Sequence, residues 1–130
     1  HSYSSAASDV YKRQELSTLG NPIADFTYHM MSWRLPAGAK GLGMMGSDLK
    51  SLNIPSENEY AELYYKKTGR EKIDNWDFYM AYNIFRLAGI AQGIVGRVRD
   101  GTASSSEAKN YEAFVPILGK LGWSIVEGIK

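Results

Sequence analysis

Residues 75–100 carry one uninterrupted helical pattern, and this stretch constrains the fold more than any other part of the chain. Asp74 or Asn75 can cap its amino end, and Gly101 follows its carboxyl end, as is common for helices. The apolar residues surround much of the helix axis, which predicts a central, buried helix. These residues are Trp76, Phe78, Tyr79, Tyr82, Phe85, Leu87, Ile90, Ile94 and Val98.

Two shorter helices are predicted before it. The first spans 21–36: Asn21 is its N-cap, Pro22 occupies the first helical position, and Pro36 ends the apolar pattern. The second spans 56–69, where Ser56 and Glu59 have the spacing of a capping box. The intervening residues 37–55 form a glycine-rich loop with one short turn.

The last predicted helical segment begins near Ser104, which forms a second possible capping box with Glu107. Pro116 should kink this segment or split it into two helices. No alternating strand pattern of useful length follows Leu16. The sequence therefore predicts an all-α body.

Composition excludes several classes of protein and site. A chain of 130 residues makes one domain at most, and without cysteine it has no disulfide or thiolate metal site. The longest uncharged apolar run, residues 87–96, is about half the length that a membrane span needs. Together these features favour a cytoplasmic protein that does not engage a membrane.

The charge of the chain does not indicate a nucleic-acid surface. Its formal net charge is +1, and residues 1–14 supply that surplus through Lys12, Arg13 and Asp9. The charges of the remaining residues balance, and no basic stripe with interleaved aromatic residues is present.

Three glycine or histidine motifs have ordinary structural explanations. GLGMMG at 41–46 matches the G-x-G-x-x-G pattern of nucleotide-binding loops. It follows a predicted helix rather than a strand, so a flexible connector is expected. Gly89, Gly93 and Gly96 predict a small-residue face for close helix packing, with a ligand groove as the lesser alternative. His29 has no second histidine or cysteine near it in sequence, which argues against a metal site.

Five polar or aromatic positions stay open between structural and functional roles. Asp25 lies in the first turn of its helix, where the helix dipole favours a carboxylate. Asp77 and Arg86, with Tyr79 and Tyr82 near them, are polar groups within an aromatic-rich stretch. They form either solvated and ion-paired positions or part of a substrate cleft.

Two stretches, ELSTLGNPIADFTYHMMSWRL at 15–35 and NWDFYMAYNIFRLAGIAQG at 75–93, carry a family resemblance. They resemble the aminoglycoside phosphotransferase family, the choline-kinase-like branch of the protein-kinase fold. The second stretch, within a similar region at 54–101, is similar to the subgroup fused to, or found beside, acyl-CoA dehydrogenases. The resemblance covers residues 15–130 and implies the helical carboxy-terminal lobe of a kinase-like fold.

The resemblance implies an ATP- and Mg²⁺-dependent enzyme that phosphorylates a hydroxyl group of a small molecule. The catalytic loop, the phosphate-orienting Lys and the second metal Asp of such enzymes lie upstream of the matched region. Where the family has an Asp-Trp-Glu-Leu run, only Glu15 and Leu16 match, and Arg13 and Gln14 replace the first two residues. The chain alone is therefore expected to be inactive, with no catalytic, cofactor-binding or metal-binding residue of its own.

The resemblance also assigns roles to individual residues. Asp25 matches the second aspartate of an Asp-Pro-x-x-Asp pattern whose first position is Asn21, and it is expected to anchor the missing catalytic loop. The residues expected to contact the acceptor are Trp33, Asp77, Tyr82 and Arg86. Their aromatic, weakly charged character fits a hydroxyacyl acceptor better than a polycationic one. An acyl-CoA dehydrogenase domain or neighbour is an expected partner.

The opening stretch SSAASDVYKRQ at 4–14 resembles the in-frame translation of a transposase sequencing adapter. Residues 1–14 are accordingly expected to be adapter-derived and disordered, with a biological extension as the alternative. Residues 15–130 are expected to form the carboxy-terminal helical subdomain of a phosphotransferase domain. The alternative function is a non-catalytic helical interaction module or a pseudokinase lobe.

Overall fold

The computed structural model describes residues 19–38, 42–102 and 108–129 of the chain. These residues are mainly helical, as the sequence predicts, and include no β-strand beyond a single bridge between Pro36 and Met45. The elements are α2 (Pro22–Met30), the 3₁₀ turn η1 (Met31–Trp33), α3 (Glu57–Thr68), α4 (Trp76–Arg99) and α5 (Ala108–Ile129). Residues 1–14 and the Ser104–Glu107 pair lie outside the described residues.

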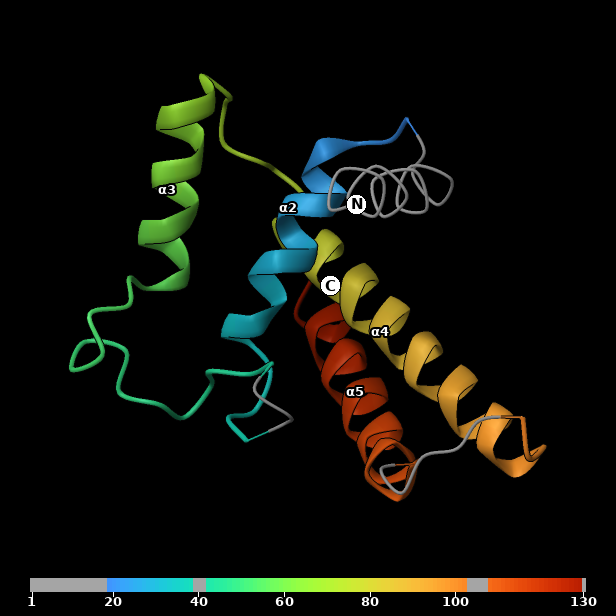
Figure 1. The fold of residues 1–130 in the computed structure, drawn as a ribbon. Helices are drawn as coiled ribbons and strands as arrows, with labels where there is room; N and C mark the ends of the chain where they lie inside the picture. The colour runs from blue at the N-terminus through green and yellow to red at the C-terminus, as the bar shows by residue number, and fades with distance from the viewer. Residues whose placement is uncertain (1–18, 39–41, 103–107, 130) are drawn as a thin grey trace, which may run out of the picture.

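The long helices α4 and α5 lie side by side, and α2 packs against the amino-terminal part of α4 (Figure 1). The core forms where these elements and η1 meet. Its buried residues are Met30, Met31, Leu35, Met80, Ile84, Leu87, Ala91 and Leu118. Helix α3 lies to one side of the other helices (Figure 1), so side chains rather than closely packed helix backbones attach it.

The predicted helix ends are confirmed where local chemistry sets them. Asn21 Oδ1 accepts a hydrogen bond from the Ile23 N–H, with Pro22 at the start of the helix. Ser56 and Glu59 form both hydrogen bonds of the capping box. Gly69 ends α3 with a φ of 66°, a left-handed conformation that glycine adopts without strain.

The predicted helix at 75–100 is central, but only part of its apolar pattern is buried. Phe78, Tyr82 and Phe85 are 60%, 51% and 41% exposed. Helices α2 and α5 cover part of the circumference of α4, and within the described residues no other helix covers the rest. The aromatic pattern therefore marks both a core face and an outer face.

The glycines of α4 do not form a helix-packing face among the described residues. A Cβ atom built at Gly89, Gly93 or Gly96 would meet nothing within 4 Å. The close approach lies on α5 instead, where a Cβ at Gly122 would be 3.0 Å from the Phe85 ring. Sequence spacing alone does not distinguish these two situations, because it does not tell which side of a helix meets its neighbour.

Pro116 lies within α5 and does not split it into two helices. Proline removes one backbone hydrogen bond, but the residues around it are held against the core. Leu118 is fully buried, and Phe114 and Val115 pack against the same cluster. Tertiary packing thus keeps both halves of α5 in one element.

Residues 42–46 of the GLGMMG motif are not a free connector. Met44 and Met45 donate backbone hydrogen bonds of 2.9 Å each to the carbonyls of Ser32 and Leu35. A Cβ at Gly43 would lie 2.0 Å from the Pro36 carbonyl oxygen, so only glycine allows this approach. The motif is a segment docked against the end of the first helical unit, and Gly41 lies outside the described residues.

Candidate functional site

A hollow of about 560 Å³ lies between the start of α2 and the amino-terminal half of α4. It brings together three of the residues predicted from sequence: Asp25, Tyr82 and Arg86. The complete lining comprises Gly20, Asn21, Ala24, Asp25, Phe78, Tyr79, Tyr82 and Arg86. Trp33 and Asp77, the other two predicted contacts, do not line it.

Helix geometry explains how these side chains converge. Phe78, Tyr82 and Arg86 follow one another at intervals of four on α4, which places them on the same side of the helix. Asp25 belongs to the first turn of α2, where the positive end of the helix dipole favours its carboxylate. The hollow therefore has a carboxylate on α2, a guanidinium on α4 and exposed aromatic surface between them.

Two polar contacts order the hollow. Asn21 Nδ2 donates a 2.7 Å hydrogen bond to the Tyr79 hydroxyl, which ties the cap of α2 to α4. The Arg86 guanidinium lies over the Tyr28 ring, 5.1 Å from its centroid. This cation–π contact positions the guanidinium without neutralising its charge. Sequence reasoning assigned Asn21 only to the helix cap and named Tyr79 only as a neighbour of Asp77 and Arg86.

Trp33 has a structural role. Its indole nitrogen donates a 2.9 Å hydrogen bond to the Pro55 carbonyl, and its ring packs against His29 and Tyr60. The His29 ring also contacts the Tyr60 hydroxyl at 3.1 Å. These contacts connect η1 and α2 to the start of α3. Trp33 and His29 therefore belong to an aromatic cluster between these elements.

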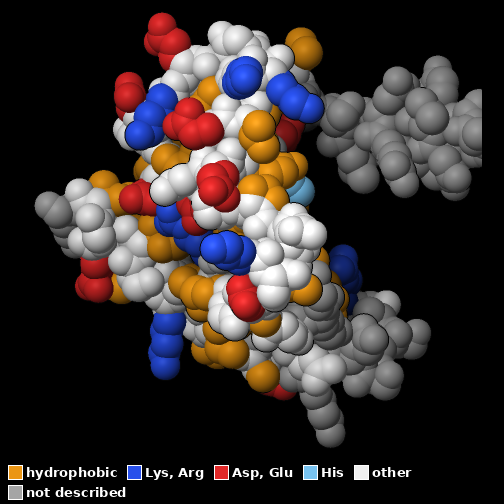
Figure 2. Space-filling model, turned by 90° about the vertical axis from the view of Figure 1, so that its left-hand side faces the viewer, with side chains coloured by type: hydrophobic (Ala, Val, Ile, Leu, Met, Phe, Trp, Pro, Cys, Tyr) orange, Lys and Arg blue, Asp and Glu red, His pale blue; other side chains and the backbone are white. Residues whose placement is uncertain are grey.

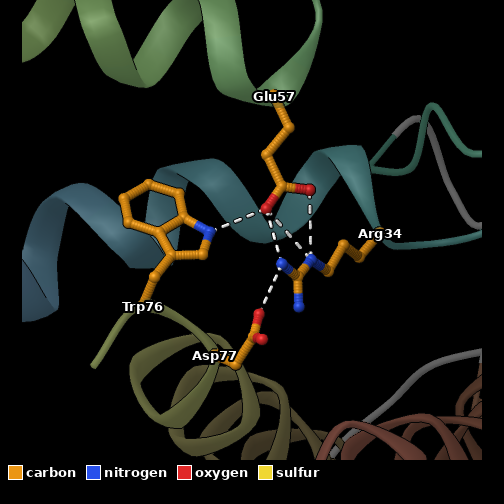
Figure 3. Close-up of polar contacts among 4 residues, drawn as sticks. All are labelled: Arg34, Glu57, Trp76 and Asp77. Carbon is orange, nitrogen blue, oxygen red and sulfur yellow. Dashed lines mark hydrogen bonds and ion pairs between the residues drawn. The ribbon is translucent and has the colours of Figure 1, made fainter. Parts of the chain in front are cut away.

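Asp77 belongs to a charge network that the sequence did not reveal (Figure 3). Arg34 donates to both oxygens of Glu57 and, through Nη2, to Asp77 Oδ1 at 2.7 Å. The Trp76 indole adds a 2.7 Å hydrogen bond to Glu57 Oε1. Glu57 and Asp77 lie 23 and 43 residues from Arg34 along the chain, so no local spacing could have indicated the network.

Arg34 is the centre of this network, and its surroundings hold it charged. Burial is the largest single influence on its pKa and opposes the charged form. The hydrogen bonds and charges of Glu57 and Asp77 together outweigh burial, so the pKa of Arg34 is raised. These groups also line a neighbouring hollow of about 480 Å³, together with other residues that include Glu62 and Lys72. The network therefore has a structural role, because it holds together the segment after η1, α3 and α4.

The described surface shows no metal-binding group, and no membrane-spanning helix is present among the described helices. The face that includes α3 shows acidic and basic side chains interspersed, with hydrophobic side chains between them (Figure 2). Within the described ranges, no group of three or more His, Asp or Glu side chains could hold a metal ion. None of the helices in those ranges is long and apolar enough to cross a membrane.

Comparison with known proteins finds relatives in one named group. The chain is 40% identical over 110 residues to acyl-CoA dehydrogenase family member 10 of Mus musculus, a match that covers 84% of this chain and 10% of that protein. It is 32% identical over 109 residues to acyl-CoA dehydrogenase family member 11 of Homo sapiens, covering 83% of this chain and 14% of that protein. A probable acyl-CoA dehydrogenase, IBR3 of Arabidopsis thaliana, is 32% identical over 100 residues, covering 72% of this chain and 12% of that protein.

The chain thus spans only 10–14% of the length of these relatives. No protein-family model matches it, and no solved structure does. The similarity identifies a shared segment within much longer proteins.

Proposed function

We propose that residues 15–130 form the acceptor-side helical lobe of an ATP-dependent small-molecule kinase. The enzyme would transfer a phosphoryl group to a hydroxyl of a hydroxyacyl compound. The observation that supports this most directly is the hollow that joins Asp25, Tyr82 and Arg86. Three residues singled out by the phosphotransferase resemblance meet there from two helices, beside exposed aromatic surface.

The character of the hollow supports an acyl-type acceptor. Its described lining contains one carboxylate and one guanidinium, whereas a polycationic acceptor would require several carboxylates. Phe78 and Tyr82 offer ring surface on which an apolar chain can lie. The names of the relatives support an acyl-CoA dehydrogenase domain or neighbour as the partner of the longer protein.

Within the described residues, no group of three or more His, Asp or Glu side chains could hold a metal ion. ATP and Mg²⁺ belong, in this proposal, to the upstream part of the longer enzyme. This chain would contribute acceptor binding and support for the catalytic loop. On its own it is expected to transfer no phosphoryl group.

Asp25 would provide that support. Its carboxylate is exposed at the start of α2, where it can accept charge-assisted hydrogen bonds from backbone N–H groups of a segment packed over the hollow. This role requires no direct contact between Asp25 and the acceptor. Asp25 would therefore be a positioning residue.

The proposal is tested on the gene recovered with the sequence upstream of codon 15. The purified product should phosphorylate a hydroxyacyl compound with ATP and Mg²⁺, and Asp25→Ala should lower kcat more than Asn21→Asp does. Asp100→Ala is the matched control, because Asp100 is an exposed carboxylate at the opposite end of α4. Phosphotransfer by residues 15–130 alone, or equal and negligible effects of both variants at positions 21 and 25, would contradict the proposal.

A non-catalytic interaction module is the second candidate, and the outer face of α4 favours it. Phe78, Tyr82 and Phe85 form a partly exposed aromatic row, in which the Phe85 ring also packs against Gly122 of α5, and exposed aromatic surface is common at protein interfaces. The upstream gene distinguishes the two candidates. An intact His-Gly-Asp catalytic loop with phosphotransfer supports the kinase, whereas substitutions there together with no activity support the module.

A further inference from the structure

The side chain of Asn21 contacts two groups, and the first fixes the orientation of its amide. The backbone N–H of Ile23 points at Asn21 Oδ1 with a donor–acceptor distance of 3.0 Å. Because a backbone N–H can only donate, the amide atom facing it must be the oxygen. The other amide atom, 2.7 Å from the Tyr79 hydroxyl, is therefore the nitrogen.

This orientation determines the polarity of Tyr79. An amide NH₂ group only donates, so the Tyr79 oxygen acts as the acceptor in this contact. Among the residues that the structure describes, Asn21 is the hydrogen-bond partner of that hydroxyl. The Tyr79 proton is not used in the contact, and Tyr79 lines the hollow. Its O–H is therefore available to donate to a ligand there.

The other lining groups extend this donor character along α4. Arg86 follows Tyr79 by seven residues, two turns along the same side of the helix, and its guanidinium carries only donors. Its described contact is the Tyr28 ring, which leaves the N–H groups at its edge able to donate. Asp25, on the α2 side, is the one carboxylate of the described lining.

We propose that the hollow binds a small carbonyl or carboxylate compound, whose sp² oxygen accepts a hydrogen bond from the Tyr79 hydroxyl, with Arg86 as a further donor two turns along α4. The apolar part of the compound lies on Phe78 and Tyr82. Asn21 is the specificity-determining residue, because it makes Tyr79 a donor toward the ligand. This inference deepens the proposed function and rests on it, since the hollow is the one assigned to the acceptor.

Asn21→Asp separates this role from helix capping. Asparagine and aspartate cap helices about equally well, so α2 should keep its start. An ionised aspartate only accepts, however, so Tyr79 would turn its proton toward residue 21 and present lone pairs to the hollow. The variant also adds a negative charge beside Asp25. Both changes disfavour an oxygen acceptor.

The test is an NMR titration of the isotope-labelled full chain with hexanoate, hexanamide and hexylammonium. Backbone and side-chain chemical shifts report binding. Hexanoate and hexanamide should perturb Tyr79 and Arg86, and hexylammonium should not. Asn21→Asp and Tyr79→Phe should each weaken binding of both oxygen acceptors by about tenfold, as expected for the loss of one hydrogen bond.

Tyr64→Phe is the matched control, because it removes a phenol hydroxyl on α3 outside the hollow and should leave binding unchanged. Circular dichroism checks that each variant keeps its helical content. If Asn21→Asp does not fold, Tyr79→Phe alone provides the test. Binding of all three probes to the same extent, or unchanged affinity in both variants, would overturn the inference. The titration contains no ATP, so its failure is distinct from a failure of the kinase proposal.

Discussion

The indole nitrogen of Trp76, the first residue of α4, donates a 2.7 Å hydrogen bond to Glu57 Oε1 in the first turn of α3. The same carboxylate accepts hydrogen bonds from two nitrogens of Arg34, Nε and Nη2. One side chain therefore connects α3 to the segment after η1 and to α4. Because α3 lies to one side of the other helices (Figure 1), its position depends strongly on Glu57.

Glu57→Gln should lower the free energy of unfolding by roughly 1–3 kcal/mol. The amide keeps an oxygen for the Trp76 indole but loses the charge that balances Arg34. The Arg34 and Glu57 side chains are only 24% and 22% exposed, so solvent screens this pair less than a surface ion pair. Urea unfolding followed by circular dichroism measures the change.

Asp77→Asn is the control within the same network. Asp77 is 54% exposed, so its ion pair with Arg34 is screened and its loss should change stability by less than about 0.5 kcal/mol. Equal losses for the two variants would contradict the central position given to Glu57.

Tyr65 should make stability fall at alkaline pH. Burial raises the pKa of its phenol, and the Ile73 N–H that contacts the hydroxyl opposes that rise. Because the folded pKa is above the unfolded one, the contribution is complete below about pH 10 and is lost as pH rises through the folded pKa. The unfolding free energy of the chain should therefore decrease as pH rises above about 10, and more steeply than that of Tyr65→Phe. Parallel pH dependence of the two proteins would contradict this account.

One substitution, glycine to alanine, should have opposite effects at two positions. Gly43→Ala should destabilise the chain by several kcal/mol, about 3 or more, because its Cβ would overlap the Pro36 carbonyl oxygen at 2.0 Å. Gly93→Ala should stabilise it by about 1 kcal/mol, because alanine favours the helix and meets nothing within 4 Å. Thermal unfolding compares the two variants, and a destabilising Gly93→Ala would indicate that a neighbour packs on this face in solution.

The outer face of α4 should bind a hydrophobic dye. Phe78 is 60% exposed beside Tyr82 and Phe85, so Phe78→Ser should reduce dye fluorescence without loss of helicity. Leu52→Ser, at a 58% exposed position in the loop before α3, should reduce it less because Leu52 lies outside the aromatic row. A monomeric chain that binds no dye would show that this face is covered.

The sequence by itself determined the helical class and most helix ends. Asn21 with Pro22, Ser56 with Glu59, and Gly69 are local signals, because a cap needs only the few residues beside it. The extent of α4 also followed from a continuous pattern closed by Gly101.

The tertiary structure decided which surfaces those helices share. The sequence did not tell which side of α4 is buried, because residues with similar hydrophobicity lie all around it and α2 and α5 cover only part of it. It also did not identify the partner of Asp77, since Arg34 lies 43 positions away in the chain. For the same reason, the sequence did not show that Asp25, Tyr79 and Arg86 line one hollow, because they lie on two helices that are distant in the chain. Contacts between distant residues depend on how helices pack, whereas caps and periodicity depend on neighbours along the chain.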